Sequence, residues 1–337
     1  MCGIICVVSR PSARPLPLAA DILDALDRAI AAGTAGNIAE SGRLVAEADA
    51  SLRGESGLGT LIDNIALVNG LISRFDQLDG LASGAEAQLE SESGLSTREV
   101  ERRSNELIAM RDASWSLRND RLRTAKAVGE LAGKDASSSA RNAYLSIQQA
   151  FSALDRMEVR GRDSAGVNVL VWGHDLDATD KRVAPLLAGR LDDALFTNGS
   201  VRVGAGNRAW SFVYKAAAEI GELGDNTRAM RTTVANDALL RLLVNQPHAR
   251  VSILGHTRWA SVGIISEPNA HPVNSEEVGG NSAAPYMLAA LNGDVDNHAD
   301  INVRNGLHIA EPITSDAKVI PTVVARKNAS GMSFVDS

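Results

Sequence analysis

Residues 35–142 differ in composition from the rest of this 337-residue chain. They are rich in Ala, Ser, Glu, Leu and Arg, and their apolar residues recur at intervals of three and four, which is the period of an amphipathic helix. A seam of the coiled-coil type is expected along one helix, formed by Leu61, Ile65, Val68, Ile72 and Phe75. The segment is therefore expected to fold as a helical hairpin or small bundle.

A second helix of this segment has a recognisable start. Ser96 and Glu99 have the spacing of a capping box, which satisfies backbone N–H groups at a helix N-terminus. Apolar residues then repeat every seven positions, at Ile108, Trp115 and Leu122. Between the two helices the chain is expected to be loosened by Gly80, Gly84 and Gly94. The segment contains no cluster of side chains with metal-ligand spacing, so we interpret it as a packing or interaction insert.

The sequence on either side of this segment alternates short strands with helices. Apolar, β-branched runs predict strands over 3–8, 165–172, 251–254 and 287–291. Amphipathic spacing predicts helices over 21–30, 143–157 and near 237–244. These patterns indicate a mixed α and β fold. Apart from the helix near 237–244, they do not determine the secondary structure of residues 181–250.

Charge and hydropathy exclude several classes of protein. The formal net charge is −7 and the pI is near 5.5, which disfavours a surface for nucleic acid or anionic membrane. No apolar run approaches the roughly 20 residues of a membrane span. The N-terminus also lacks the basic and apolar regions of a secretory signal. We therefore expect a cytoplasmic protein without nucleic-acid or membrane partners.

The two cysteines, Cys2 and Cys6, have different expected roles. Their number and spacing exclude a disulfide framework and argue against a structural zinc site. Cys6 lies inside the predicted first strand and is interpreted as a small buried hydrophobe. Cys2 follows Met1, and its small side chain permits ordinary removal of the initiator methionine. The mature chain would then begin with a residue that has both a thiol and a free α-amine.

Polar side chains suited to chemistry concentrate in a few short segments, namely MCGII (1–5), RGRDSAG (160–166), GHTRWASVG (255–263) with SEPNAHP (266–272), and LNGDVDNH (291–298). Each alone has an ordinary interpretation. Residues 160–166 could be a helix-ending turn, Arg258 and Trp259 a surface cation–π pair, and Asn292-Gly293 a hairpin turn. Their joint presence in this order is far more specific.

Together these segments resemble the N-terminal glutaminase domain of class II glutamine amidotransferases, and most closely the glutamine–fructose-6-phosphate aminotransferase (glucosamine-6-phosphate synthase) family. The SDAKVI stretch (315–320) resembles a further segment of that family. The likeness covers residues 1–10 and about 145–325. It implies a glutaminase domain over 1–10 and 143–337, separated by the helical insert at 35–142.

The chemistry of the residues agrees with the reaction that the resemblance implies. A terminal Cys2 supplies its thiol as nucleophile and its α-amine, with an ordinary pKa of about 8, as base. The Asn292 amide and the Gly293 N–H, just past a predicted strand, suit the oxyanion that forms when the thiolate attacks the amide of glutamine. Ammonia leaves, and water hydrolyses the γ-glutamyl thioester. This step needs no metal or organic cofactor.

Recognition of L-glutamine needs partners for its α-carboxylate and its α-ammonium. Arg258 can bind the carboxylate with its planar fork, and the resemblance assigns the ammonium to Asp316. Ser261 can add a hydroxyl contact, although the chain has Ser261-Val262 where the family commonly has Thr-His.

Other residues are expected to support the site. The resemblance makes Trp259 a gate for ammonia, with a simple pocket wall as the alternative. Arg160 and Asp163 would brace the loop beside Cys2, and His271 would support the site, with purely structural roles left open for all three.

The resemblance implies an α+β fold, a four-layer αββα sandwich of the N-terminal-nucleophile hydrolase type. The resemblance also implies that the fold is incomplete at its C-terminus and that the chain lacks the family's sugar-isomerase half, which aminates fructose 6-phosphate to glucosamine 6-phosphate. The full-length protein is expected to be a homo-oligomer. Two alternatives remain open: a glutaminase domain for another acceptor, such as phosphoribosylpyrophosphate, and an inactive fragment that acts as an interaction module.

Overall fold

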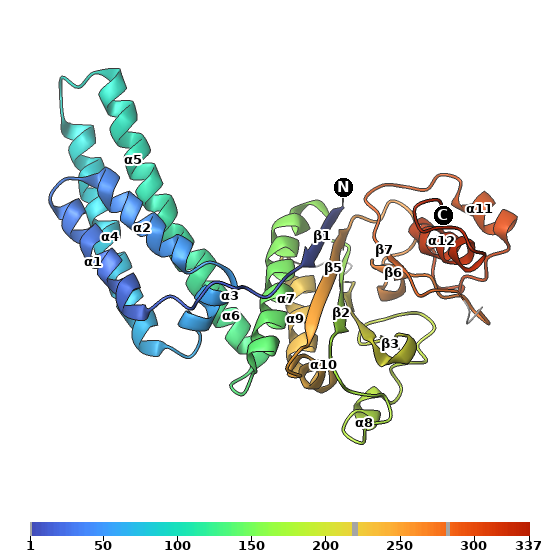
Figure 1. Cartoon of the computed structure of the whole chain (residues 1–337). Coiled ribbons are helices and arrows are strands. Elements are labelled where there is room, and N and C mark those ends of the chain that lie inside the picture. The colour runs from blue at the N-terminus through green and yellow to red at the C-terminus, as the bar shows by residue number, and fades with distance from the viewer. Residues whose placement is uncertain (1, 218–221, 281–283) are drawn as a thin grey trace. The chain divides into compact units, whose positions relative to one another are not determined.

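The computed structural model describes residues 2–217, 222–280 and 284–337, and it divides into two compact units (Figure 1). The helical unit is Arg10–Glu130, and the α/β unit combines Met1–Ser9 with Leu131–Ser337. The predicted insert, 35–142, therefore has different boundaries in the structure. Met1, whose removal the sequence predicts, lies outside the described residues.

The helical unit is a series of helices, with α6 ending just beyond it: α1 (Ala19–Thr34), α2 (Ile38–Ser51), α3 (Gly54–Leu61), α4 (Ile65–Ser91), α5 (Thr97–Trp115), a π-helical stretch (Ser116–Leu122) and α6 (Arg123–Ala132). The side chain of Ser96 accepts a hydrogen bond from Glu99 N at 3.2 Å, so the predicted start of α5 is confirmed. The expected break at Gly80 and Gly84 is wrong. Helix α4 continues through both because its packing against α1 and α5 outweighs the low helix propensity of glycine.

The predicted apolar seams differ from the buried faces in the structure, and the first does not follow one helix, because Leu61 ends α3 and Ile65 begins α4. Ile65 and Ile72 are 74% and 46% exposed, and Ile108 and Trp115 are each 56% exposed. The buried positions of α4 are instead Leu67, Leu71, Phe75, Leu78 and Ala82. Apolar residues occur on more than one face of these helices, so spacing alone did not determine which face would be covered.

A five-stranded antiparallel sheet forms the centre of the α/β unit, in the order β1-β5-β2-β4-β3. Its strands are β1 (Gly3–Val8), β2 (Ser164–Trp172), β3 (Val201–Val203), β4 (Ala209–Ala216) and β5 (Arg250–Arg258). The predicted strands at 3–8 and 165–172 are confirmed, and the one at 251–254 is longer than predicted. Strands β3 and β4 lie in the region that the sequence left ambiguous.

Helices cover one face of this sheet (Figure 1): α7 (Ser138–Met157), α9 (Asp225–Asn236) and α10 (Ala238–Val244). The helix predicted at 143–157 thus begins earlier than predicted. The helix predicted near 237–244 is confirmed. The Asp237 side chain caps it by accepting hydrogen bonds from Leu239 N and Leu240 N. A short helix, α8 (Ala184–Leu187), lies between β2 and β3 in sequence.

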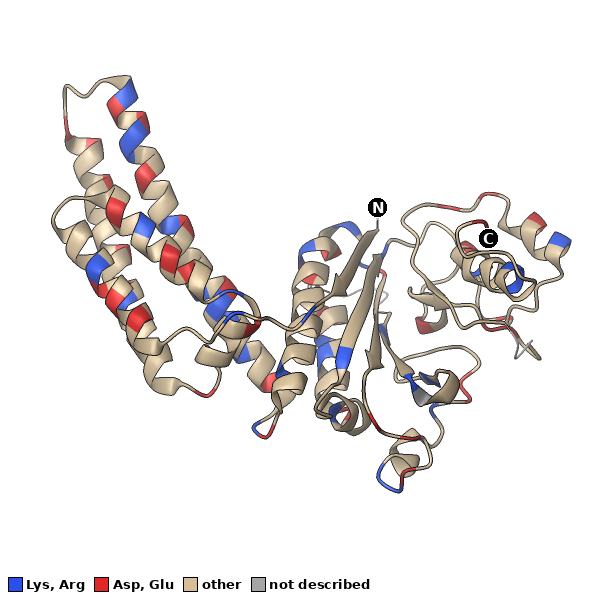
Figure 2. Ribbon diagram, viewed as in Figure 1, with Lys and Arg blue, Asp and Glu red and all other residues tan. Residues whose placement is uncertain are grey.

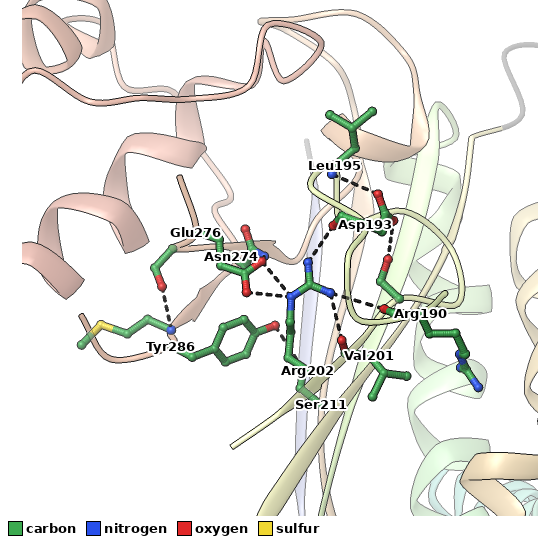
Figure 3. Close-up of polar contacts among 12 residues, drawn as sticks. Arg190, Asp193, Leu195, Val201, Arg202, Ser211, Asn274, Glu276 and Tyr286 are labelled. Carbon is green, nitrogen blue, oxygen red and sulfur yellow. Dashed lines mark hydrogen bonds and ion pairs between the residues drawn. The ribbon is translucent and has the colours of Figure 1, made fainter. Parts of the chain in front are cut away.

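A second, two-stranded sheet consists of β6 (Val273–Asn274) and β7 (Leu288–Ala289), shorter than the strand predicted over 287–291. Helix α12 (Val319–Ala329) packs on both strands and contacts α11 (His298–Asn305). Arg202 of β3 connects this sheet to the large one, because its Nε donates to both carboxylate oxygens of Glu276 at 2.6 and 2.8 Å (Figure 3). The hydroxyls of Ser211, on β4, and Tyr286 lie 3.2 Å apart and add a second connection.

Strand β1 lies at the edge of the large sheet, and this determines the environment of Cys6. Gly3 faces α7, since a Cβ there would lie 2.7 Å from Met157, whereas Ile4, Cys6 and Val8 face the other way. Cys6 is exposed, and Val8 is 71% exposed. The expectation that Cys6 is a buried hydrophobe is therefore wrong, because Cys6 lies on an edge strand and its side chain faces away from α7.

Candidate active site

Antiparallel pairing brings three of the motif segments to one end of the large sheet. Strand β5 lies between β1 and β2, and the register places its last residues beside the first residues of both neighbours. Cys2 precedes β1, Asp163 precedes β2 and Trp259 follows β5. These residues are far apart in sequence. They meet because β5 runs antiparallel to β1 and β2, so that its C-terminal end lies beside the N-terminal ends of both.

Cys2 makes contacts with two of these distant segments. The backbone N–H of Trp259 donates to Cys2 Sγ at 3.3 Å, and Sγ also lies 3.7 Å from the Trp259 carbonyl oxygen. The Cys2 backbone nitrogen donates to Asn292 Oδ1 at 3.2 Å. Because Oδ1 is the acceptor, the amide nitrogen of Asn292 is the end of the side chain that can donate to another group. Asn292 and Gly293 are both exposed.

Two buried histidines contact the residue that precedes Asn292. His256 Nε2 lies 2.9 Å from the carbonyl oxygen of Leu291, and His271 Nδ1 accepts from Leu291 N at 3.2 Å. The sequence drew attention to His271 but missed His256. Strand alternation could have found it, because His256 has the same inward parity as Arg258 on β5.

Glycine at position 166 allows the segment containing His271 to approach the sheet. A Cβ at Gly166, in β2, would lie 2.1 Å from the carbonyl oxygen of His271, closer than any real contact. The last glycine of RGRDSAG, Gly166, is therefore needed because another backbone segment passes close to it, and not because the chain turns there.

Arg258 is 3% exposed, and its guanidinium is already engaged. Its two terminal nitrogens donate to the carbonyl oxygens of Val262 and of Ile264, the latter at 3.1 Å. Burial lowers the pKa of Arg258, while the nearby charges of Cys2, Asp316 and Asp163 act in the opposite direction. In this conformation the guanidinium holds the loop 259–264 through two of its N–H groups, and binding of a carboxylate by Arg258 stays a prediction.

Asp316 and Ser261, both predicted to bind glutamine, contact the loop that follows Gly293. The Asp316 carboxylate accepts from Val295 N at 2.6 Å and is 5% exposed. The Ser261 hydroxyl donates to Asp294. Both residues border the site, and their contact with substrate stays a prediction.

The position of Asp316 depends on Asn269, which sequence reasoning missed. Asn269 is buried, and its Oδ1 accepts from Thr314 N at 2.7 Å and from Ser315 N at 2.8 Å. Its amide nitrogen donates to Pro312 O at 3.0 Å. A buried asparagine inside SEPNAHP therefore organises the chain that leads to Asp316, and its position between two prolines was the available signal.

The remaining predicted site residues differ in their surroundings. The Asp163 carboxylate accepts from Ala260 N at 2.6 Å and so holds the chain just after Trp259. Trp259 itself is 57% exposed. Arg160 is exposed, and it forms no hydrogen bond or ion pair with the residues that the structure describes, so no contact there supports a bracing role.

Residues 2–217, 222–280 and 284–337 contain neither a cluster of metal ligands nor a helix suited to a membrane. Within them, no group of three or more His, Cys, Asp or Glu is arranged to hold a metal ion. In the same ranges, no helix combines the length and the apolar character needed to cross a membrane.

Part of this chain is similar to a known enzyme. Over 102 residues it is 32% identical to the glutamine–fructose-6-phosphate aminotransferase (isomerizing) of Mesorhizobium japonicum. The likeness is to a glutamine amidotransferase. It covers 29% of this chain but only 15% of that enzyme. No family model and no solved structure matches the chain.

Proposed function

We propose that the α/β unit is the glutaminase domain of a class II glutamine amidotransferase, with Cys2 as its nucleophile. The observation that carries the proposal is that three segments distant in sequence meet at one residue, Cys2. Cys2 Sγ lies 3.3 Å from Trp259 N, and Cys2 N lies 3.2 Å from Asn292 Oδ1. The partial likeness to an aminotransferase that uses glutamine supports the same function.

The first half of the reaction releases ammonia. After removal of Met1, the α-amine of Cys2 takes the thiol proton, and the sulfur attacks the side-chain amide carbon of glutamine. The C–S bond forms while the carbonyl π electrons move to oxygen. The ammonium of Cys2 then returns its proton to the amide nitrogen, the C–N bond breaks and ammonia leaves. A γ-glutamyl thioester remains on Cys2.

The second half regenerates the enzyme. Water attacks the thioester carbon, the Cys2 amine takes one of its protons, and the C–S bond breaks to give glutamate and the free thiol. Both halves pass through an oxyanion, which requires hydrogen-bond donors that are already in place. The free amide nitrogen of Asn292 and the backbone N–H of Gly293 are the proposed donors.

The fold of the N-terminal-nucleophile hydrolases is also part of the proposal. Its support is the order of layers in the α/β unit, in which helices α7, α9 and α10, the large sheet, the β6–β7 pair and α12 follow one another. In this proposal the β6–β7 pair is the reduced counterpart of the second sheet.

The acceptor of the ammonia is proposed from the similar enzyme alone. The name of that enzyme makes fructose 6-phosphate the first candidate, which a separate sugar-isomerase domain would aminate. A different acceptor domain would leave the glutaminase chemistry unchanged.

The test is the stoichiometry of glutamine hydrolysis by this chain. We expect equal amounts of glutamate and ammonia from L-glutamine, and no ammonia from L-asparagine, whose shorter side chain cannot place its amide at Cys2 while its α-groups are held. Absence of ammonia release by folded protein that has lost Met1 would overturn the proposal.

A further inference from the structure

The backbone of Leu291 lacks the partners that a strand would give it. Strand β7 ends at Ala289, and Asn292 follows Leu291 directly. The N–H and the C=O of Leu291 instead both bond to imidazole rings, those of His271 and His256. Backbone polar groups that are shielded from water need partners, and at Leu291 imidazole rings supply the partner of both groups.

The hydrogen bonds fix the tautomer of each ring. A carbonyl oxygen can only accept, so His256 Nε2 carries a proton and donates it to Leu291. A backbone N–H can only donate, so His271 Nδ1 is unprotonated, and its Nε2 carries the proton toward Ser315 Oγ at 3.2 Å. Each ring therefore has one correct protonation pattern in this arrangement.

The two rings form a rigid, neutral pair. Their centroids lie 4.4 Å apart with an interplanar angle of 34°, and their side chains are buried. Burial lowers the pKa of His256 to about 4. Burial also places the pKa of His271 well below its ordinary value, with His256, Arg258 and Lys215 adding to the effect. Both rings are thus neutral near pH 7, as the two hydrogen bonds require.

We propose that His256 and His271 are positioning residues that set the orientation of Asn292 toward Cys2 by holding both peptide groups of Leu291. This inference rests on the proposed glutaminase function. The pair acts through Leu291 and does not itself touch the substrate. Because a donor displaced by a fraction of an ångström loses much of its effect on an oxyanion, the pair determines kcat rather than the binding of glutamine.

Matched substitutions test this directly. Glutamine can place an amide nitrogen where histidine has Nε2, and asparagine can place an amide oxygen where histidine has Nδ1. His256→Gln and His271→Asn therefore keep the bond to Leu291, whereas His256→Asn and His271→Gln lose it. The two pairs contain the same residue types, so a general effect of losing an imidazole cancels between them.

The expected result is a split between kcat and KM. The two variants that lose the bond should have kcat lowered by about tenfold with little change in KM, and the two that keep it should stay within about threefold of the parent. In an Asn292→Ala background the four substitutions should have no further effect on kcat, because the donor that they position is absent. Equal kcat in all four variants, or an equal loss in both backgrounds, would overturn the proposal.

A second measurement separates this inference from the proposed function. In isotopically labelled protein without substrate, the side-chain amide resonances of Asn292 should shift in His256→Asn and His271→Gln, and remain close to the parent in the other two. If the shifts follow this pattern but no variant hydrolyses glutamine, the positioning role stands and the glutaminase function fails. If hydrolysis is found but the resonances do not move, the positioning role fails alone.

Discussion

The two units of this chain use charged residues in different ways. In the helical unit many ion pairs join residues three or four apart, as when Arg102 bonds Glu99 and Glu106, and Figure 2 shows the two signs interleaved along α5. In the α/β unit, the carboxylates of Asp163 and Asp316 bond backbone N–H groups that are 97 and 21 residues away in sequence. The ion pairs of the helical unit stabilise individual helices. The carboxylates of the α/β unit hold loops of the candidate active site in place.

This difference shows where the chemistry lies. Exposed pairs one helical turn apart contribute about 0.2–0.5 kcal/mol each and bring no distant segments together. The carboxylates of Asp163 and Asp316 hold loop backbones near Cys2, so a substitution of either should disturb the geometry of the site. The helical unit should therefore tolerate substitutions that the site does not.

The largest effect should come from Cys2→Ala. Removal of the nucleophile leaves no route to the thioester, so glutamine hydrolysis should fall by about 10³-fold or more. The measurement is ammonia release under saturating glutamine. Cys6→Ala is the matched control, since Cys6 is exposed four residues farther along the chain, in β1, and none of the hydrogen bonds of the site involves it, so this variant should keep nearly full activity. Equal losses in the two variants would contradict the assignment.

Asn292→Ala should have the next largest effect. It removes a donor aimed at the oxyanion, so kcat should fall by roughly 10²-fold with little change in KM. Steady-state kinetics would measure both constants. Asn297→Ala, on the same loop and also exposed, provides the control, because the Asn297 side chain makes no capping hydrogen bond to α11. A change in KM alone would show that Asn292 binds substrate instead.

These site residues were accessible from the sequence because short motifs carry their own chemistry. Cys2 was singled out by its place after Met1, whereas Asn292 and Asp163 were proposed because their motifs resemble those of a known family, and the antiparallel sheet explains why Cys2 and Asp163 lie close together. His256 and Asn269 were missed because their importance comes from what they bond, which is far away in the chain. Neither partner can be derived from a local window of sequence.

The fold was predictable where a local sequence pattern determines the structure, and not where packing between distant elements determines which residues are buried. The capping by Ser96 and the strand at 3–8 follow from local rules. The buried face of α4 and the exposure of Cys6 depend on which other elements pack against them. A local pattern of apolar residues does not identify those elements.

Within the helical unit, Asp49→Asn should be the most damaging polar substitution. Asp49 is 2% exposed and accepts hydrogen bonds from Arg121, Arg53 and Ser116. We expect the free energy of unfolding to fall by about 1–3 kcal/mol at neutral pH, as measured by denaturant unfolding. Asp24→Asn is the control, because among the described residues Asp24 forms only an exposed ion pair, with Arg28 at 3.7 Å, and the substitution should change stability by less than about 0.5 kcal/mol.

The effect of Asp49→Asn should depend on pH. Burial alone would raise the pKa of Asp49, but the hydrogen bonds from Arg121, Arg53 and Ser116 lower it below its ordinary value. A carboxyl with a lowered pKa in the folded state stabilises the fold above its ordinary pKa, and this contribution is lost as the pH falls through the folded-state value. The difference between parent and variant should therefore shrink below about pH 4. A difference that grows on acidification would contradict the assignment.

The smallest effect on chemistry should come from the largest deletion. Replacing Arg10–Glu130 with a short flexible linker removes the helical unit, and glutamine hydrolysis should stay within about twofold of the parent, because none of the site contacts uses these residues. Initial rates at saturating glutamine would measure this. Loss of activity in a soluble, folded variant would show that the helices contribute to the site.

The most direct test is to locate the covalent adduct of a glutamine analogue that carries an electrophilic diazoketone. The labelled protein would be digested and its peptides mapped by mass spectrometry. We predict a single adduct on Cys2, in a chain that has lost Met1, and protection of Cys2 by excess L-glutamine. Adducts on Cys6 to the same extent, or labelling of Cys2 that glutamine does not slow, would contradict the claim that the α/β unit presents Cys2 to glutamine.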